Sequence, residues 1–440
     1  ENDNIAIGYA AMTTNTAGGS ENIALGNYAL DALTSGDSNV AVGHQALTTN
    51  TTGGGNIAVG KLALEDNTTG SGNVAIGGEA LKNNTTASSN VAIGTDAMGT
   101  NTTGAECVAV GKEALTTNNA NRGTAVGYQA LKDNTTGIQN TAVGKGASQL
   151  NTTAADNTSV GYHAMNQNTT GAGNVAVGKF ALTNNTTASN NTAVGIDALR
   201  VNTTGADNVA VGPYALDALS TGDQNIAIGR HALGATTGSD NIGIGQTALY
   251  VNTTGTRNTA IGTNCLDASD TENDNIAIGY TAMTVMNGGG EKNVVIGNYA
   301  ADANEAGEDN VIIGHNAATS MTSADNNVII GLGACGAATM IGNDNVFIGK
   351  DSGNANTDGL GNAAVGKDTL KVNDSGQRNV ALGNSALLAN TTANYNVALG
   401  FEALKDNTDA TGGIAIGKSA AAANTTGLRN IAIGFEAYSA

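Results

Sequence analysis

The 440-residue sequence has very little of the material from which an ordinary globular core is built. It contains no Trp, aromatic residues make up 3% of it, and one Pro, Pro213, stands against 62 Gly. Because large side chains normally fill a core, any core here must be thin. The single Pro and the lack of a Gly-X-Y period exclude a collagen triple helix. Charged residues are 12% and hydrophobic residues 40%, which is not the composition of a chain kept unfolded by its charge.

Basic residues are also scarce, with 18 Lys and Arg against 37 Asp and Glu and a formal net charge of -19. Nucleic-acid binding relies on basic side chains that displace counterions, so we expect no nucleic-acid partner. The sequence lacks the run of about 18 apolar residues that a spanning helix needs, so we expect no membrane insertion. It starts at Glu1 inside a repeat, with neither an initiating Met nor a signal peptide, which suggests a mature product or a fragment.

What the sequence does have is a short internal repeat. The string N-V-A-V-G recurs with small variations 26 times between Asn4 and Gly434, at intervals of 17 residues in twenty cases, 18 in three and 16 in two. The consensus is N-V-A-V-G-x-x-A-L-x-x-N-T-T-G-x-x, and positions 1 to 17 below refer to it. A longer period is present too, because the segment at 1–13 returns almost unchanged at 272–284.

The pattern within one unit predicts β structure. Positions 2 to 4 alternate β-branched residues with Ala, which predicts a strand of four or five residues. The Gly at position 5 then marks a corner that a Cβ would obstruct, and Pro213 at position 6 suits a corner as well. Ala-Leu at positions 8 and 9 predicts a second short strand, and N-T-T-G supplies a turn.

Such a unit cannot bury its own apolar face, so identical units must stack. We therefore predict an all-β parallel β-solenoid of about 26 coils, forming one elongated domain over residues 1–440 and roughly 125 Å long at the usual strand spacing. Each column becomes a ladder, with Asn amides bonding from coil to coil. The expected structural corner residues are Gly8, Gly26, Gly43, Gly60, Gly77, Gly94, Gly178 and Gly434. The expected ladder residues are Asn4, Asn22, Asn39, Asn56, Asn73 and Asn174.

The N-x-A-[IV]-G strand with its Gly corner resembles the head repeats of trimeric autotransporter adhesins. The fuller pattern at Asn191–Gly205 is similar to repeats of phage and bacterial tail-fibre-domain proteins. The resemblance covers essentially the whole chain. It implies a left-handed β-roll, a homotrimer and a place on a cell surface or virion.

Several motifs that suggest chemistry are products of the repeat. Residues 412–419 fit the phosphate-loop spacing and residues 331–336 fit the dinucleotide fingerprint, but no helix pattern follows either one. The cysteines are far apart and odd in number, which predicts small buried side chains rather than disulfides or zinc. They are Cys107, Cys265 and Cys335. The histidines stand on widely separated coils, so no two could share a metal. They are His44, His163, His231 and His315. We expect no enzyme and no cofactor.

Two columns offer binding surfaces instead. Tyr recurs at positions 6 or 7, where amphipathic rings could contact a glycan or simply cover a corner. The candidate glycan contacts are Tyr9, Tyr28, Tyr128, Tyr162 and Tyr214. Twelve Asn-Thr-Thr triplets give Thr rows that could bind ice, and each triplet is formally an N-glycosylation acceptor. Turn carboxylates such as Asp37 and Asp223 could hold Ca²⁺.

The sequence taken as a whole favours a structural fibre or adhesin shaft, extracellular on a cell surface or virion appendage. We expect it to self-associate as a homotrimer or filament and to meet a host-surface receptor or glycan. The alternative is a glycan-binding or ice-binding solenoid that uses the Tyr or Thr columns.

Overall fold

The computed structural model describes residues 3–15, 17–286 and 288–438. The protein is an all-β parallel β-solenoid with one short strand in each of 26 coils, and the described ranges contain no helix. It divides into two compact units, residues 1–221 and residues 222–440. The predicted fold class is confirmed.

The first unit contains thirteen three-residue strands. They are β1 Ile5–Ile7, β2 Ile23–Leu25, β3 Val40–Val42, β4 Ile57–Val59, β5 Val74–Ile76, β6 Val91–Ile93, β7 Val108–Val110, β8 Thr124–Val126, β9 Thr141–Val143, β10 Thr158–Val160, β11 Val175–Val177, β12 Thr192–Val194 and β13 Val209–Val211. The second unit contains thirteen more. They are β14 Ile226–Ile228, β15 Ile242–Ile244, β16 Thr259–Ile261, β17 Ile276–Ile278, β18 Val294–Ile296, β19 Val311–Ile313, β20 Val328–Ile330, β21 Val346–Ile348, β22 Ala363–Val365, β23 Val380–Leu382, β24 Val397–Leu399, β25 Ile414–Ile416 and β26 Ile431–Ile433.

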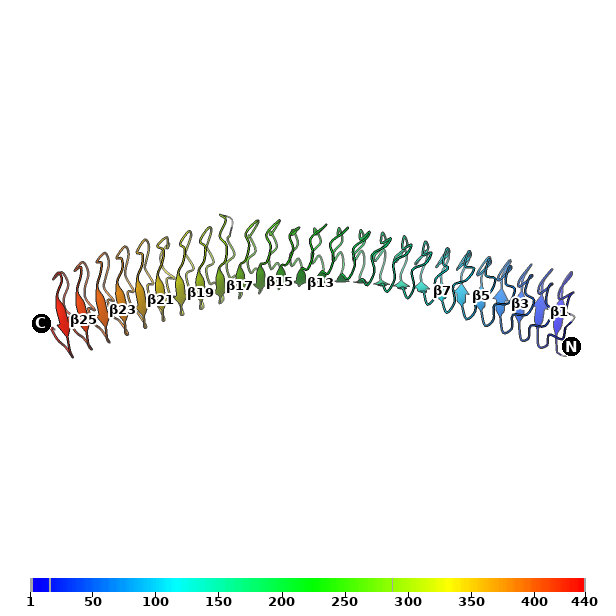
Figure 1. Cartoon of the computed structure of the whole chain (residues 1–440), viewed down its shortest axis with the longest axis horizontal. Helices are drawn as coiled ribbons and strands as arrows, with labels where there is room; N and C mark the ends of the chain where they lie inside the picture. The colour runs from blue at the N-terminus through cyan, green and yellow to red at the C-terminus, as the bar shows by residue number, and fades with distance from the viewer. Residues whose placement is uncertain (1–2, 16, 287, 439–440) are drawn as a thin grey trace. The chain divides into compact units, whose positions relative to one another are not determined.

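Within each unit every strand pairs in parallel with the next along the chain, and equivalent positions face one another. In the first unit Ala41 of β3 pairs with Ala58 of β4, and the same register holds from β1 to β13. In the second unit it holds from β14 to β26. Coils of 16 or 18 residues keep this register because their extra or missing residue lies in the turns. Figure 1 shows successive strands side by side in each unit.

Two details of the predicted coil are wrong. The strands have three residues rather than four or five, and Ala-Leu at positions 8 and 9 is not a strand. Positions 7 and 9 instead take left-handed backbone conformations, as in Gln45 at φ 58° and Leu47 at φ 53°. Such residues turn the chain and cannot continue an extended strand. The segment still bonds to its neighbour, since the amide of Leu47 donates to the carbonyl of Ala63 at 3.0 Å.

The core is thin, as the composition predicts. In the coil of β4, Ala58 at position 3, Ala63 at position 8 and Leu64 at position 9 are fully buried. The flanking strand residues Ile57 and Val59 point the other way and remain 38% and 36% exposed. The strand therefore turns its smallest side chain inward and its two large apolar side chains outward.

Candidate functional site

The predicted corner glycines end the strands and lie against the backbone of the next coil. Gly43 has φ 139°, and a Cβ built on it would stand 2.4 Å from the carbonyl oxygen of Gly60. Both the backbone angle and the close approach require glycine. Gly8, Gly26, Gly60, Gly77, Gly94 and Gly178 have the same geometry. Gly434 also has a positive φ, of 127°, but no further coil follows it, and its nearest contact would be Ala437 at 3.9 Å.

The predicted asparagine ladder joins consecutive coils through side chains. The side-chain oxygen of Asn22 accepts from the backbone amide of Asn39 at 2.9 Å, and the Asn39 amide group donates to the carbonyl of Gly53 at 2.9 Å. One side chain thus ties its own turn and fixes the start of the next strand. Asn4, Asn56, Asn73 and Asn174 bond in the same pattern. Buried amides satisfied in this way stabilise a fold that has little apolar material.

A second buried asparagine ladder was not predicted, because the N-T-T-G segment was expected to supply a turn and nothing more. At position 12, the Asn67 amide group donates to the side-chain oxygen of Asn50 at 2.9 Å and to the carbonyl of Gly70 at 3.0 Å. Asn50 and Asn67 are fully buried. The signal was the recurrence of Asn at position 12. A glycan on these N-T-T asparagines would break the ladder, so folded coils are poor acceptors.

The threonine of position 13 also bonds within the ladder. The hydroxyl of Thr51 donates to the carbonyl of Thr68 at 3.0 Å, and that of Thr68 donates to Thr85 at 2.9 Å. These hydroxyls are therefore committed to neighbouring coils. The arrangement does not favour an ice-binding row at position 13.

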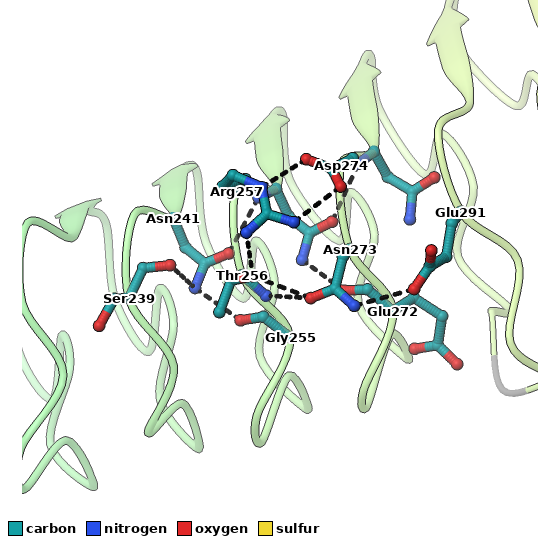
Figure 2. Close-up of polar contacts among 11 residues, drawn as sticks. Ser239, Asn241, Gly255, Thr256, Arg257, Glu272, Asn273, Asp274 and Glu291 are labelled. Carbon is teal, nitrogen blue, oxygen red and sulfur yellow. Dashed lines mark hydrogen bonds and ion pairs between the residues drawn. The ribbon is translucent and has the colours of Figure 1, made fainter.

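Outer turns carry polar contacts that reach from coil to coil, as Figure 2 shows for the second unit. Arg257 forms two hydrogen bonds with Asp274, at 2.6 and 2.8 Å. The side-chain oxygen of Asn273 accepts from the backbone amide of Thr256 at 2.8 Å, and its amide group donates to Glu291 at 2.9 Å. The Arg257 guanidinium lowers the pKa of the Asp274 carboxyl. Because these groups are exposed, the contacts organise turns and contribute little to stability.

The candidate tyrosines do not form one stripe. In the first unit, Tyr9 and Tyr28 meet edge to face with ring centres 5.4 Å apart, and Tyr28 meets His44 at 6.1 Å. These rings are exposed, Tyr9 by 69%. They form a short aromatic row across three coils.

A second aromatic cluster lies further along the first unit. The amine of Lys145 is 5.8 Å from the ring centre of Tyr128 and 5.7 Å from that of Tyr162. Tyr162 also contacts Phe180, with ring centres 5.4 Å apart. Tyr214, in the coil of β13, is half-buried. The structure therefore brings Tyr128 and Tyr162 together and leaves Tyr9 and Tyr28 as a separate group.

The nucleotide motif at 412–419 is part of the ladder. Its centre is strand β25, whose Ile414 amide donates to Asn430 at 2.8 Å, and the amide of Gly417 donates to Leu399 at 2.8 Å. A phosphate-binding loop needs such amides turned toward a ligand. These amides are bonded to neighbouring coils instead.

Cysteines and carboxylates offer no cluster for chemistry in the described ranges. Cys107, Cys265 and Cys335 are buried, and burial raises the pKa of each thiol, that of Cys265 to about 12. No group of three or more His, Cys, Asp or Glu side chains gathers there to hold a metal ion. Over those same ranges, no helix is long and apolar enough to cross a membrane.

The largest regular surface is the outward face of the strands, formed by the side chains at positions 2 and 4. We call it the strand face. Among the described strands none contains a charged residue, and the face is mostly Val, Ile and Leu. Thirteen strands about 4.8 Å apart extend it over roughly 60 Å in each unit. A continuous apolar surface of this kind marks a site of association in soluble proteins.

The chain matches no protein-family model, and a comparison with curated proteins gives no match.

Proposed function

We propose that this protein is the shaft of an extracellular fibre or adhesin, which assembles with copies of itself through the strand face. The observation that carries the proposal is the outward placement of the large strand side chains. In β2, Ile23 and Leu25 are 38% and 44% exposed while Ala24 between them is fully buried. The coil therefore closes its own core with alanine and leaves its larger apolar side chains for another surface.

The repeat favours a second copy as the occupant of that surface. The strand face presents the same two side chains in every coil, and a partner that packs along it needs the same spacing. Another copy of this chain has that spacing. A homomeric interface of this kind buries apolar side chains and excludes water, which stabilises the assembly.

Charge favours the same face. The chain has a net charge of -19, so two copies repel one another when their charged surfaces approach. The strands contribute none of that charge. The strand face is consequently the surface on which two copies approach with the least repulsion.

The in-register ladders support a mechanical role. Each coil is joined to the next by backbone bonds of the strand, by the Asn column at position 1 and by the Asn column at position 12. Stretching a stack of this kind requires many bonds to break together. The resemblance to adhesin-head and tail-fibre repeats supports an extracellular location.

Sedimentation velocity over a range of concentrations tests the assembly. The wild-type chain of 43.4 kDa is expected to sediment as a multiple of that mass. Lysine at Ile57, Val59, Val74 and Ile76 places four charges on the strand face of β4 and β5 and should shift the protein toward the single chain. The control carries lysine at Thr52 and Thr69, which are exposed in the turns. It should sediment like the wild type. A wild-type chain that stays at 43.4 kDa at every concentration would contradict the proposal.

A further inference from the structure

The second unit contains a hollow that breaks the repeat. It has a volume of about 540 Å³ and is lined by positions 6, 7, 10 and 11 of successive coils. Its polar lining side chains are Tyr299, Asp302, His315, Asn316, Thr319 and Asn354. The volume lies within the range of about 300–1,000 Å³ that is typical of small-molecule sites.

Two glycines make the hollow. Gly333 and Gly336 occupy positions 7 and 10 of the coil of β20, and no other coil in the sequence has Gly at both positions. These positions carry the outward side chains that fill the same surface elsewhere. A Cβ at Gly336 would stand 2.8 Å from the carbonyl oxygen of Asn316, so the backbone itself comes close at this point.

The chain contains its own filled version of the site. The segment that returns after 271 residues places Leu62 opposite Gly333 and Glu65 opposite Gly336. Glu65 there forms an ion pair with Lys82, with a nitrogen-to-oxygen distance of 3.8 Å. The two copies of the block therefore differ at the residues that would close the hollow.

An aromatic row leads into the hollow. The ring of Tyr299 meets that of Tyr280 with centres 5.4 Å apart and that of His315 at 5.9 Å, both edge to face. Tyr299 is 40% exposed. A fixed, exposed ring beside a polar hollow offers an apolar platform next to hydrogen-bonding groups.

The polar groups are held in place by neighbouring coils. The Asn354 amide group donates to the carbonyl of Gly333 at 2.8 Å, and the hydroxyl of Thr319 donates to that of Gly336 at 2.7 Å. Asp302 accepts from the hydroxyl of Thr284. Such contacts fix the lining before any ligand arrives, which lowers the cost of binding.

We infer that this hollow binds a neutral saccharide unit. A sugar ring has an apolar face of C–H groups and a rim of hydroxyls, which match the Tyr299 ring and the surrounding amides, hydroxyl and carboxylate. No Lys or Arg lines the hollow, and the net charge is -19, so the site offers nothing to a phosphate or sulfate. The inference does not depend on self-association through the strand face.

Saturation-transfer NMR with glucose, galactose, mannose and N-acetylglucosamine, each up to about 20 mM, tests the inference at the weak affinities that single sugars show. At least one sugar should bind, and Gly333→Leu should weaken that binding about tenfold or more by filling the hollow. Leucine is tolerated by this backbone, since Leu62 has φ 60° and Gly333 has φ 62°.

A second variant guards against a general effect on folding. Asn316→Ala removes a lining amide and should also weaken binding, while Gln45→Ala at the equivalent place in the filled block should leave it unchanged. Ala10 shows that alanine adopts the left-handed angle of position 7, at φ 52°. Absence of any sugar signal, or a signal that survives both Gly333→Leu and Asn316→Ala, would overturn the inference.

Discussion

The side-chain oxygen of Asn157 accepts a hydrogen bond from the backbone amide of Asn174, 17 residues further along the chain, at 2.8 Å. Asn174 in turn donates to the carbonyl of Ala188 at 2.9 Å and accepts from the amide of Asn191 at 2.8 Å. Each side chain in this column therefore satisfies two buried backbone groups.

Replacing Asn174 with Ala should leave the Asn191 amide and the Ala188 carbonyl without their partner. We expect a loss of about 1–3 kcal/mol in the free energy of local unfolding, because buried polar groups would go unsatisfied. Hydrogen exchange of the neighbouring coils measures it. Asn184→Ala, at half-buried position 11, is the control and should change stability by less than about 0.5 kcal/mol. Equal protection in the two variants would refute the role of the ladder.

The corner column should be the least tolerant of substitution. Gly178 has φ 140°, and a Cβ on it would stand 2.3 Å from the carbonyl oxygen of Gly195. Gly178→Val should therefore cost about 3 kcal/mol or more and expose nearby coils to protease.

The matched control for that corner is Gly72→Asn. Gly72 has φ 65°, a Cβ on it would meet nothing within 4 Å, and Asn190 adopts φ 61° in the same column. Asparagine should be accepted there with little change in melting temperature. If Gly178→Val melted and digested like Gly72→Asn, the corner would not need glycine.

The Glu113 carboxylate should make stability depend on pH in acid. Its pKa is lowered from 4.5 to about 2, first by the hydrogen bond from Gln129 at 2.7 Å and then by Lys132 at 3.1 Å. A carboxyl with a lowered folded-state pKa stabilises the fold above its unfolded pKa, and that contribution is lost as the pH falls from about 4.5 toward 2.

Gln129→Leu removes the largest cause of that shift. The midpoint of the Glu113 side-chain carbon signal in an NMR titration should then move upward from about 2 toward the ordinary value of 4.5. Glu113→Gln should make unfolding less sensitive to pH over the same window. A Glu113 midpoint near 4.5 in the wild type would contradict this.

The three cysteines should resist alkylation while the protein is folded. Burial raises the pKa of Cys265 to about 12, and Cys107 and Cys335 are buried as well. At about pH 8, a thiol with that pKa is ionised in roughly one molecule in ten thousand, and the thiolate is the reactive form. Mass spectrometry after iodoacetamide treatment should find none modified in buffer and all three modified in guanidinium chloride. Rapid labelling of Cys265 in the folded protein would show that its coil opens.

The repeat made the fold predictable because each coil supplies the same short-range signals. The strand of Ile57–Val59, the corner at Gly60 and the ladder residue Asn56 follow from the pattern of one unit. The outward direction of Ile57 and Val59 does not follow from it, since an alternation of Ala with Ile or Val is apolar on both faces. Only the packing of Ala58 against the rest of the coil decides which face points inward.

Two other features depended on contacts between coils. The left-handed angle of Leu64, φ 52°, is unusual for leucine, and it is compensated by the bond from its amide to the carbonyl of Ala80 at 3.0 Å. No local propensity predicts it, so a second strand was expected there. The hollow at Gly333 and Gly336 was missed because positions 7 and 10 line one surface only after the coil has folded.

Labelling of a cysteine on the strand face tests the central proposal most directly. Val59→Cys places a thiol on the strand face, and Thr69→Cys places one in the exposed turn of the same coil. If copies of the chain cover the strand face, Val59→Cys should react with a maleimide about tenfold or more slowly than Thr69→Cys, because burial in an interface blocks access. Equal rates at concentrations where the protein is assembled would contradict self-association through the strand face.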